Sequence, residues 1–238
     1  MKKKILSVIV CNKTDTPSEL NVDGFEILTA DEKPLREIIK RSGGKYTLIV
    51  NGGFRLANAA DFANEAQSYN SDVLLFDGGY CFKTSILKNV NNKYADKYSA
   101  EIAATLSSKS ISKSSCKPLE YIESETEYTD EFEQSLLESL SEFEAVKTRI
   151  QKEVYNFARD LICEKLIKFY MCAMLAIRKK QLDAQKLIDF DENLGRNHVI
   201  LYHILENRFD AADFEKLKSK KFKISFITAN KFKKILKK

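Results

Sequence analysis

Apolar residues form short continuous runs in the first half of the chain and recur at helical spacing in the second half. Four of the runs have the length of strands, and the first is nearly continuous, as expected of a strand that is covered on both faces. They are Ile5–Val10, Phe25–Thr29, Tyr46–Val50 and Val73–Phe76. Between and after them, residues 34–40, 57–69 and 98–106 have the spacing of amphipathic helices. Strands that alternate with helices predict an α/β fold with a mostly parallel sheet.

The serine-rich segment Ser107–Ser115 contains only Ser, Lys and Ile, and its composition predicts a loop. The character of the chain changes shortly after this segment. We therefore expect two domains: residues 1–122 as the α/β domain and residues 123–238 as a largely α-helical region with a basic tail.

A helical pattern begins at Glu131 and carries a heptad row. Leu136, Phe143, Ile150 and Phe157 lie seven residues apart. One interpretation is a long helix that packs on the rest of the protein. The other is self-association as a coiled coil, or contact with another protein, through residues 131–161.

The pattern predicts that the helix continues from Leu161 to Leu187. The polar segment Asp189–Asn193 predicts a break in the helical structure. Two short helices are expected beyond it, at Val199–Leu205 and Ala211–Leu217.

Charge is distributed unevenly along the 238 residues. The formal net charge is +5, but residues 215–238 hold ten lysines and one acid, so the rest of the chain is acidic. Residues 118–146 hold ten acids and no basic residue. This distribution argues against a uniformly basic surface for duplex nucleic acid. The tail, residues 216–238, has two principal interpretations: it folds back on the acidic stretch 120–144, or it binds an anionic membrane surface. Nucleic acid is a third, less favoured partner.

The five cysteines are scattered and form no C-x-x-C pair. This usage predicts reduced thiols in a cytoplasmic protein, located peripherally at the inner membrane surface if the tail binds there. No apolar run approaches the ~20 residues of a membrane span. The apolar run near the N-terminus is short for a signal peptide, and we interpret it as the first strand.

Seven segments occur in an order that resembles a known family. They are Leu6–Asn12, Gly24–Asp31, Gly44–Gly53, Asp72–Phe76, Phe82–Lys88, Ser99–Leu106 and Lys117–Ile122. In this order they resemble the motifs of family 2 glycosyltransferases with the GT-A fold, in a shortened form. The resemblance covers about half of the chain and implies a GT-A-like sheet flanked by helices.

The resemblance also implies positions for a nucleotide-sugar and for catalysis. The nucleotide-sugar positions are Val10, Asn12, Asp31, Asn51, Gly52, Gly53 and, if it faces the cleft at a strand end, Asp77. The alternative for Asp77 is a plain turn residue. Glu101 aligns with the last acid of the E-D-x-E motif, which leaves Ser99 at the position of the catalytic base. A shifted alignment would place Asp96 there instead.

Departures from the family pattern concern the metal. Members of the family hold Mg²⁺ or Mn²⁺ against the diphosphate with a D-x-D motif, because the metal neutralises the leaving group. The aligned residues here are Asn51, Gly52 and Gly53. We therefore predict no metal ligand. Mg²⁺ or Mn²⁺ with a nucleotide-sugar is expected only if other carboxylates replace the motif.

These observations lead to three hypotheses. The leading one is a glycosyltransferase-like protein related to surface polysaccharide assembly. Its metal-dependent sugar transfer is absent or weak, and it acts as a partner or scaffold. The alternative is an active glycosyltransferase with displaced metal and base ligands. The third is an interaction module whose α/β similarity to the family is accidental.

Overall fold

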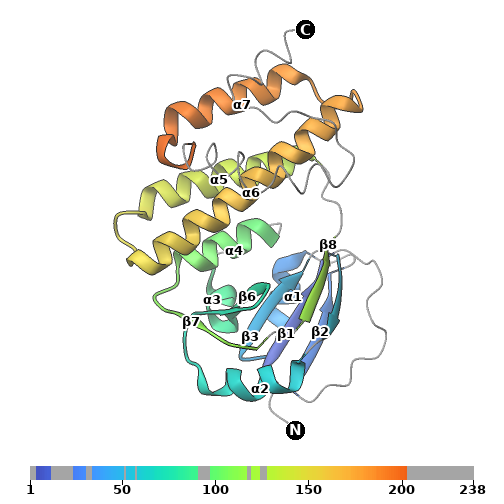
Figure 1. Ribbon diagram of the computed structural model, residues 1–238, viewed down its shortest axis with the longest axis vertical. Coiled ribbons are helices and arrows are strands. Elements are labelled where there is room, and N and C mark those ends of the chain that lie inside the picture. The colour runs from blue at the N-terminus through green and yellow to red at the C-terminus, as the bar shows by residue number, and fades with distance from the viewer. Residues whose placement is uncertain are drawn as a thin grey trace. The chain divides into compact units, whose positions relative to one another are not determined.

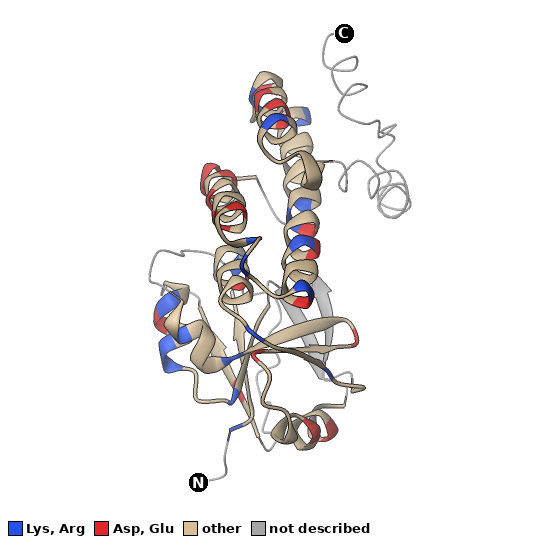
Figure 2. Cartoon of the chain, turned by 90° about the vertical axis from the view of Figure 1, so that its left-hand side faces the viewer, with Lys and Arg blue, Asp and Glu red and all other residues tan. Residues whose placement is uncertain are grey.

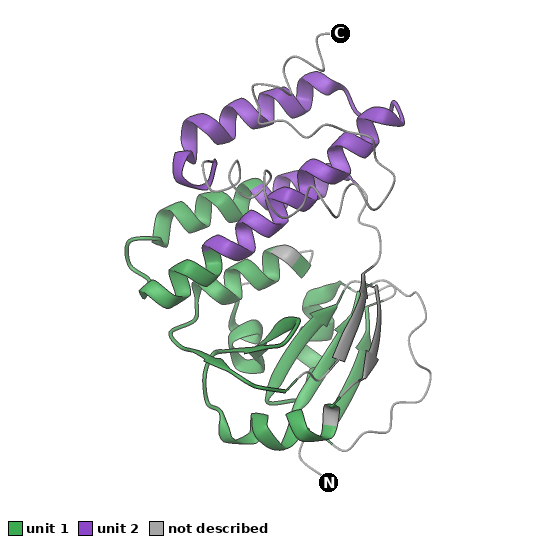
Figure 3. Ribbon diagram, in the orientation of Figure 1, with its two compact units in different colours: residues 1–125, 137–158 green, residues 126–136, 159–238 purple. Residues whose placement is uncertain are grey.

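A computed structural model describes residues 4–11, 24–30, 34–50, 52–56, 58–90, 97–116, 119–123 and 128–202, with the backbone alone for residues 52–56, 59, 98 and 119–123. The chain divides into two compact units (Figure 3). The first contains residues 1–125 and 137–158, and the second contains residues 126–136 and 159–238.

A six-stranded sheet forms the centre of the first unit (Figure 1). Its strands are β1 (Leu6–Val10), β2 (Phe25–Thr29), β3 (Tyr46–Val50), β5 (Val73–Phe76), β6 (Gly79–Lys83) and β7 (Ile111–Lys113), in the order β2-β1-β3-β6-β5-β7. β6 is antiparallel to both of its neighbours, and the other five strands run in one direction. The α/β class and the mostly parallel sheet are thus confirmed.

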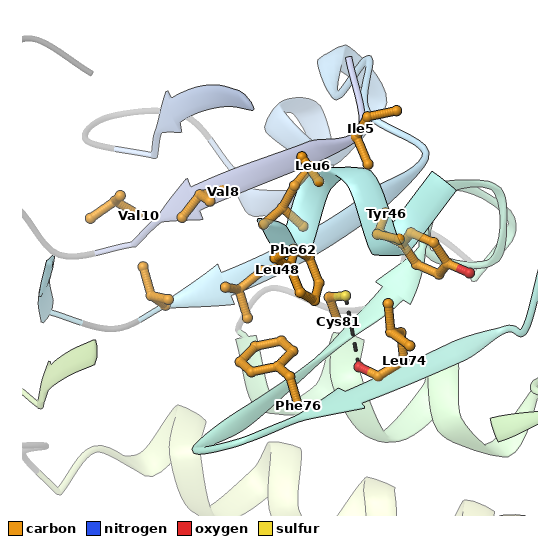
Figure 4. Close-up of a cluster of buried hydrophobic side chains, with 13 residues drawn as sticks. Ile5, Leu6, Val8, Val10, Tyr46, Leu48, Phe62, Leu74, Phe76 and Cys81 are labelled. Carbon is orange, nitrogen blue, oxygen red and sulfur yellow. Dashed lines mark hydrogen bonds between the residues drawn. The ribbon is translucent and has the colours of Figure 1, made fainter. Parts of the chain in front are cut away.

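Helices cover both faces of this sheet. α2 (Ala59–Ser68) packs on one face through Phe62 and Ala66. Figure 4 shows this cluster, in which Val8, Leu48 and Phe76 from three strands point towards Phe62. The helices α1 (Leu35–Arg41), α3 (Thr84–Asn89) and α4 (Lys97–Leu106) contribute to the cluster on the other face. Because both faces are covered, β1 and β3 are buried along their whole length.

A buried polar cluster ties the amino-terminal ends of β1 and β3 to β2. The Ser7 hydroxyl donates to the Glu26 carboxylate at 2.8 Å, and so does the Gly43 N–H. The Gly44 N–H donates to the Ser7 hydroxyl at 2.9 Å, and Lys4 forms an ion pair with Glu26. Burial alone would raise the pKa of Glu26, but these donors outweigh it and the net pKa is lowered.

Lys45 joins the start of β3 to the end of α2. Its ammonium group donates to the carbonyl oxygens of Ala66, Gln67 and Tyr69, at 2.8 Å for Gln67. These carbonyls lie in and just after the last turn of α2, where a helix leaves its carbonyl groups without intrahelical partners. A cation at this end also interacts favourably with the helix dipole.

The segment Ser107–Ser115 is not an open loop, so that prediction was wrong. Residues 111–113 form β7, which pairs in parallel with β5. Glu65 of α2 accepts from Cys116, Ser114 and Tyr69, and these donors lower the pKa of Glu65 to about 2. Backbone pairing and this carboxylate order a segment whose composition alone predicts mobility.

A second, two-stranded sheet pairs β4 (Gly52–Leu56) with β8 (Leu119–Glu123) in antiparallel register. β4 begins two residues after the end of β3. Gly52 and Gly53, the last two of the three residues aligned with the acidic motif, therefore start a new strand.

The predicted long helix is two helices, α5 (Asp130–Val146) and α6 (Lys152–Arg178). The ring of Phe143 stacks on Tyr155 with centroids 5.5 Å apart. In one continuous helix, residues twelve apart would be separated by about 18 Å. The chain therefore reverses at residues 147–151, although the heptad row runs through the reversal.

The predicted helix to Leu187 and the predicted break at Asp189–Asn193 were also wrong. α6 ends at Arg178, and α7 runs from Ala184 to Asn197, through the polar segment. Asp183 caps α7 by accepting from the Gln185 N–H at 2.9 Å. Asp189 and Asn193 are exposed four residues apart, whereas Phe190 is buried, so the polar residues mark the outer face of a helix rather than its end.

Aromatic stacking and one ion-pair cluster hold the second unit together. Phe169 of α6 lies 4.4 Å from Phe190 of α7 between ring centroids. Lys186 of α7 pairs with Asp130 of α5 at 2.6 Å and with Glu133 at 3.4 Å. The acidic helix α5, which contains no Lys or Arg, thus receives a basic partner from α7 (Figure 2).

Residues 199–202 are helical, and the rest of the predicted helix Val199–Leu205, the predicted helix Ala211–Leu217 and the basic tail lie outside the described residues. All five cysteines are described, and none of them forms a disulfide. No helix in the described part of the chain has the length and apolarity needed to cross a membrane.

We predict that Gly44→Ala destabilises the protein, whereas Gly43→Ala does not. A Cβ at residue 44 would lie 2.6 Å from the Ser7 backbone nitrogen, and this contact cannot relax without moving β1. The expected loss is about 1–3 kcal/mol of unfolding free energy. At residue 43 the nearest atom is 3.4 Å away, on the flexible Lys4 side chain. Urea unfolding of the two variants tests the difference, and equal stabilities would contradict it.

Candidate functional site

The carboxyl-terminal ends of β1, β2 and β3 meet at one edge of the sheet. Val10 is in register with Thr29 on one side and with Val50 on the other. The Cys11 N–H donates to the Val50 carbonyl at 2.9 Å, and the Ala30 N–H donates to the Val10 carbonyl at 2.9 Å. The backbones of three strand ends are therefore hydrogen-bonded to one another.

Chain order makes this edge the place where a ligand is expected. From β1 the chain goes to β2 on one side, and it then returns through α1 to β3 on the other side. Open α/β sheets bind ligands at such a switch point, beyond the carboxyl ends of the strands. We call this region the carboxyl edge and use the name for the ends of β1, β2, β3 and β5 with the start of β6.

Four of the predicted site residues lie outside the described residues: Asn12, Asp31, Asn51 and Asp96. In sequence, Asn12 follows Cys11, Asp31 follows Ala30 and Asn51 follows Val50. The structure thus brings together the residues that immediately precede three of the four, and the placement of the four themselves remains a prediction.

Val10 is described, and its side chain is 1% exposed in the core cluster beside α2. Because that side chain is committed to the core, only the backbone of Val10 is available to a ligand. Its carbonyl already accepts from Ala30. Val10 therefore contributes its backbone, and not its side chain, to the carboxyl edge.

Gly52 and Gly53 lie in β4, in register with Glu123 and Ile122 of β8. Glycine supplies no carboxylate, and no group of three or more His, Cys, Asp or Glu that suits a metal ion occurs among the described residues. Mg²⁺ prefers carboxylate oxygens and near-octahedral geometry. The residues described do not fit the divalent metal that the family resemblance implies.

Asp77 lies in the tight turn between β5 and β6, where Phe76 is paired with Gly79. It is exposed, and the next residue, Gly78, has a φ of +86°, a conformation that favours glycine. β5 runs parallel to β1, so Asp77 lies at the carboxyl edge and is a turn residue at the same time.

Glu101 lies on α4 and is almost completely buried, with a side chain that is 2% exposed. It accepts a hydrogen bond from the Tyr80 hydroxyl at 3.0 Å and pairs with the Lys97 ammonium at 3.7 Å. A general base must reach the proton that it removes. Glu101 instead holds two side chains in place, so a positioning role suits it better.

Tyr80 and Lys97 were not among the predicted site residues. Tyr80 is the second residue of β6, and its ring packs edge-on against Phe82 and Phe157, with centroids 5.7 and 5.3 Å away. These contacts direct its hydroxyl towards Glu101. The signal in the sequence was the spacing of Lys97 and Glu101, four residues apart on a predicted helix.

Comparisons with known proteins assign no family to this chain. No family model matches the chain, and no curated protein matches it. A crystal structure of S. aureus TarS is similar, with a TM-score of 0.45 and 15% sequence identity. The similarity covers 87% of this chain and 50% of that chain, so this chain spans about half of its length. A TM-score below 0.5 does not establish a common fold, and nothing about function follows from it.

We predict that Glu101→Ala lowers the unfolding free energy by about 2–3 kcal/mol, because it leaves a tyrosine hydroxyl and an ammonium group without their carboxylate. Glu37→Ala is the control: Glu37 is exposed on α1, and removing such a side chain changes stability by less than about 0.5 kcal/mol. Urea unfolding measures both. Equal, small effects would show that the Glu101 contacts add nothing to stability.

Proposed function

We propose that this chain binds a nucleotide-sugar at the carboxyl edge and is a glycosyltransferase-like protein related to surface polysaccharide assembly. The observation that carries the proposal is the hydrogen-bonded convergence of β1, β2 and β3 at the switch point. Three residues that the family resemblance assigns to the nucleotide-sugar, Asn12, Asp31 and Asn51, follow these strand ends directly in sequence.

Within this proposal the chain does not transfer sugar by the usual metal-dependent route. The two acids of the motif are replaced by Asn51 and Gly53, and Gly53 and the intervening Gly52 are part of the β4–β8 ladder. Without a metal, the leaving diphosphate loses the charge stabilisation that makes transfer fast. The chain would then act as a partner or scaffold that senses or presents the donor.

The second candidate is an active glycosyltransferase with displaced ligands. One observation favours it: Asp77 is exposed at the carboxyl edge, and Asp96 precedes the first residue of α4 in sequence. Two carboxylates from these places would be needed to replace the missing motif. Among the described residues, Asp77 belongs to no group of three or more His, Cys, Asp or Glu that could hold a metal ion.

We expect calorimetry to show that UDP or a UDP-sugar binds the full chain, with an affinity that EDTA does not change. In a radiolabelled donor panel with Mn²⁺, we expect no hydrolysis or transfer above the buffer blank. Absence of binding for every nucleotide-sugar would contradict the proposal. Turnover that requires Mn²⁺ and is lost in Asp77→Asn would instead establish the second candidate.

A role as a partner would involve the helical region. The structure limits which surface of α5 another protein could contact. Four apolar residues of α5, which we call the seam, are buried within this chain: Phe132, Leu136, Leu140 and Phe143. Ile150 and Phe157 of the heptad row are only partly buried. A second copy could reach them only if α5 were displaced. A partner would instead contact the outer side of α5, where Glu131 and Glu138 are exposed.

We therefore predict that the full chain sediments as a monomer at tens of micromolar, in sedimentation velocity experiments at physiological salt. The buried seam gives the physical reason, since opening it would expose four large apolar side chains to water. A concentration-dependent dimer that Leu140→Glu abolishes without unfolding the monomer would favour self-association through residues 131–161.

A further inference from the structure

A nucleotide-sugar without a metal needs another source of positive charge. Its diphosphate carries negative charge on adjacent phosphates, and the residues described at the carboxyl edge do not fit a divalent ion. Phosphate-binding sites that lack a metal use Lys, Arg or helix N-termini. The question is which described cation lies at this edge.

Lys97 is the first residue of α4, and the direction of α4 places it at the carboxyl edge. α3 follows the end of β6 at the opposite edge, and β7 follows the end of α4 and runs parallel to β1. α4 therefore begins near the carboxyl edge and ends near the opposite edge. Ala100, in the first turn of α4, belongs to the same apolar cluster as Cys11 and Tyr80.

The Lys97 side chain is held rather than mobile. It is 17% exposed, and its ammonium lies 3.7 Å from a Glu101 carboxylate oxygen. Glu101 is in turn fixed by the Tyr80 hydroxyl at 3.0 Å. An ammonium group has three N–H donors, so a carboxylate on one side is compatible with a phosphate oxygen on another. Burial also strengthens the attraction relative to a fully exposed lysine.

We propose that Lys97 binds the diphosphate of the nucleotide-sugar in place of the metal, with Glu101 and Tyr80 as positioning residues. This inference rests on the proposed function, because it assumes that the carboxyl edge takes a nucleotide-sugar. The positive end of the α4 dipole acts in the same direction, and α4 has ten residues.

Isothermal calorimetry in EDTA tests the proposal with two ligands, UDP and uridine, on the folded full chain. Lys97→Met should weaken UDP binding at least tenfold and leave uridine binding unchanged, because uridine has no phosphate. Lys97→Arg should bind UDP within about threefold of the original chain, since it keeps the positive charge. Lys88→Met is the matched control: Lys88 is exposed on α3, and its loss should change neither ligand.

The outcomes separate this inference from the proposed function. UDP binding that survives Lys97→Met overturns the role of Lys97 and leaves the proposed function standing. Equal losses of affinity for UDP and uridine would show that Lys97 only supports the fold. This result would also overturn the proposed role of Lys97. UDP binding that needs Mn²⁺ overturns the metal-free site. If the original chain binds neither UDP nor uridine, the proposed function and this inference fail together.

Discussion

The fold depends on how closely the start of β3 approaches β1. At Gly44 there is no room for a Cβ, and the backbone N–H of this residue donates to the Ser7 hydroxyl. Ser7 and Gly43 in turn donate to Glu26 of β2, so three consecutive strands of the sheet are fixed at their amino-terminal side by one carboxylate and one hydroxyl. Because β1 pairs with β2 and β3 in continuous registers, fixing the register at one end of the strands also fixes it at the other. Val10, Ala30 and Val50 are therefore brought together at the carboxyl edge by contacts made at Ser7, three residues before Val10, and at Gly44, six residues before Val50.

Sequence patterns predicted the parts of this fold in which local preference and burial agree. β1, β3 and β5 are apolar along their length because helices cover both faces, and such runs are visible without a structure. β7 and the reversal between α5 and α6 were missed because their causes are not local. β7 is ordered by pairing with β5 and by hydrogen bonds to Glu65, although its own segment is all Ser, Lys and Ile. The reversal is set by Phe143 stacking on Tyr155, and no glycine or proline marks it.

Parts of the candidate site could likewise be predicted from the sequence, and other parts could not. Chain order and strand ends indicated where a ligand would lie, and the structure places Val10, Gly52 and Asp77 at or next to that edge. The environment of Glu101 could not be predicted, because its burial depends on Tyr80, which is 21 residues away in the sequence. In the sequence, Glu101 resembles part of a catalytic motif. In the structure, its carboxylate accepts from the Tyr80 hydroxyl and pairs with Lys97. Asn12, Asp31, Asn51 and Asp96 remain predictions.

Electrostatics links the missing acids to the partly buried Lys97. Two unit charges 4 Å apart interact by about 4 kcal/mol at an effective dielectric constant of 20. Carboxylates that hold a metal would, without the metal, repel a diphosphate with energies of this size. In the site that we propose, the uncharged Asn51 and Gly53 at the two acid positions would avoid that repulsion, and the cation of Lys97 would replace part of the lost attraction. A single lysine beside a carboxylate cannot neutralise a leaving diphosphate as a divalent ion does. The arrangement that we propose for binding without a metal would therefore also disfavour transfer, which is the combination expected of a protein that recognises a donor without consuming it.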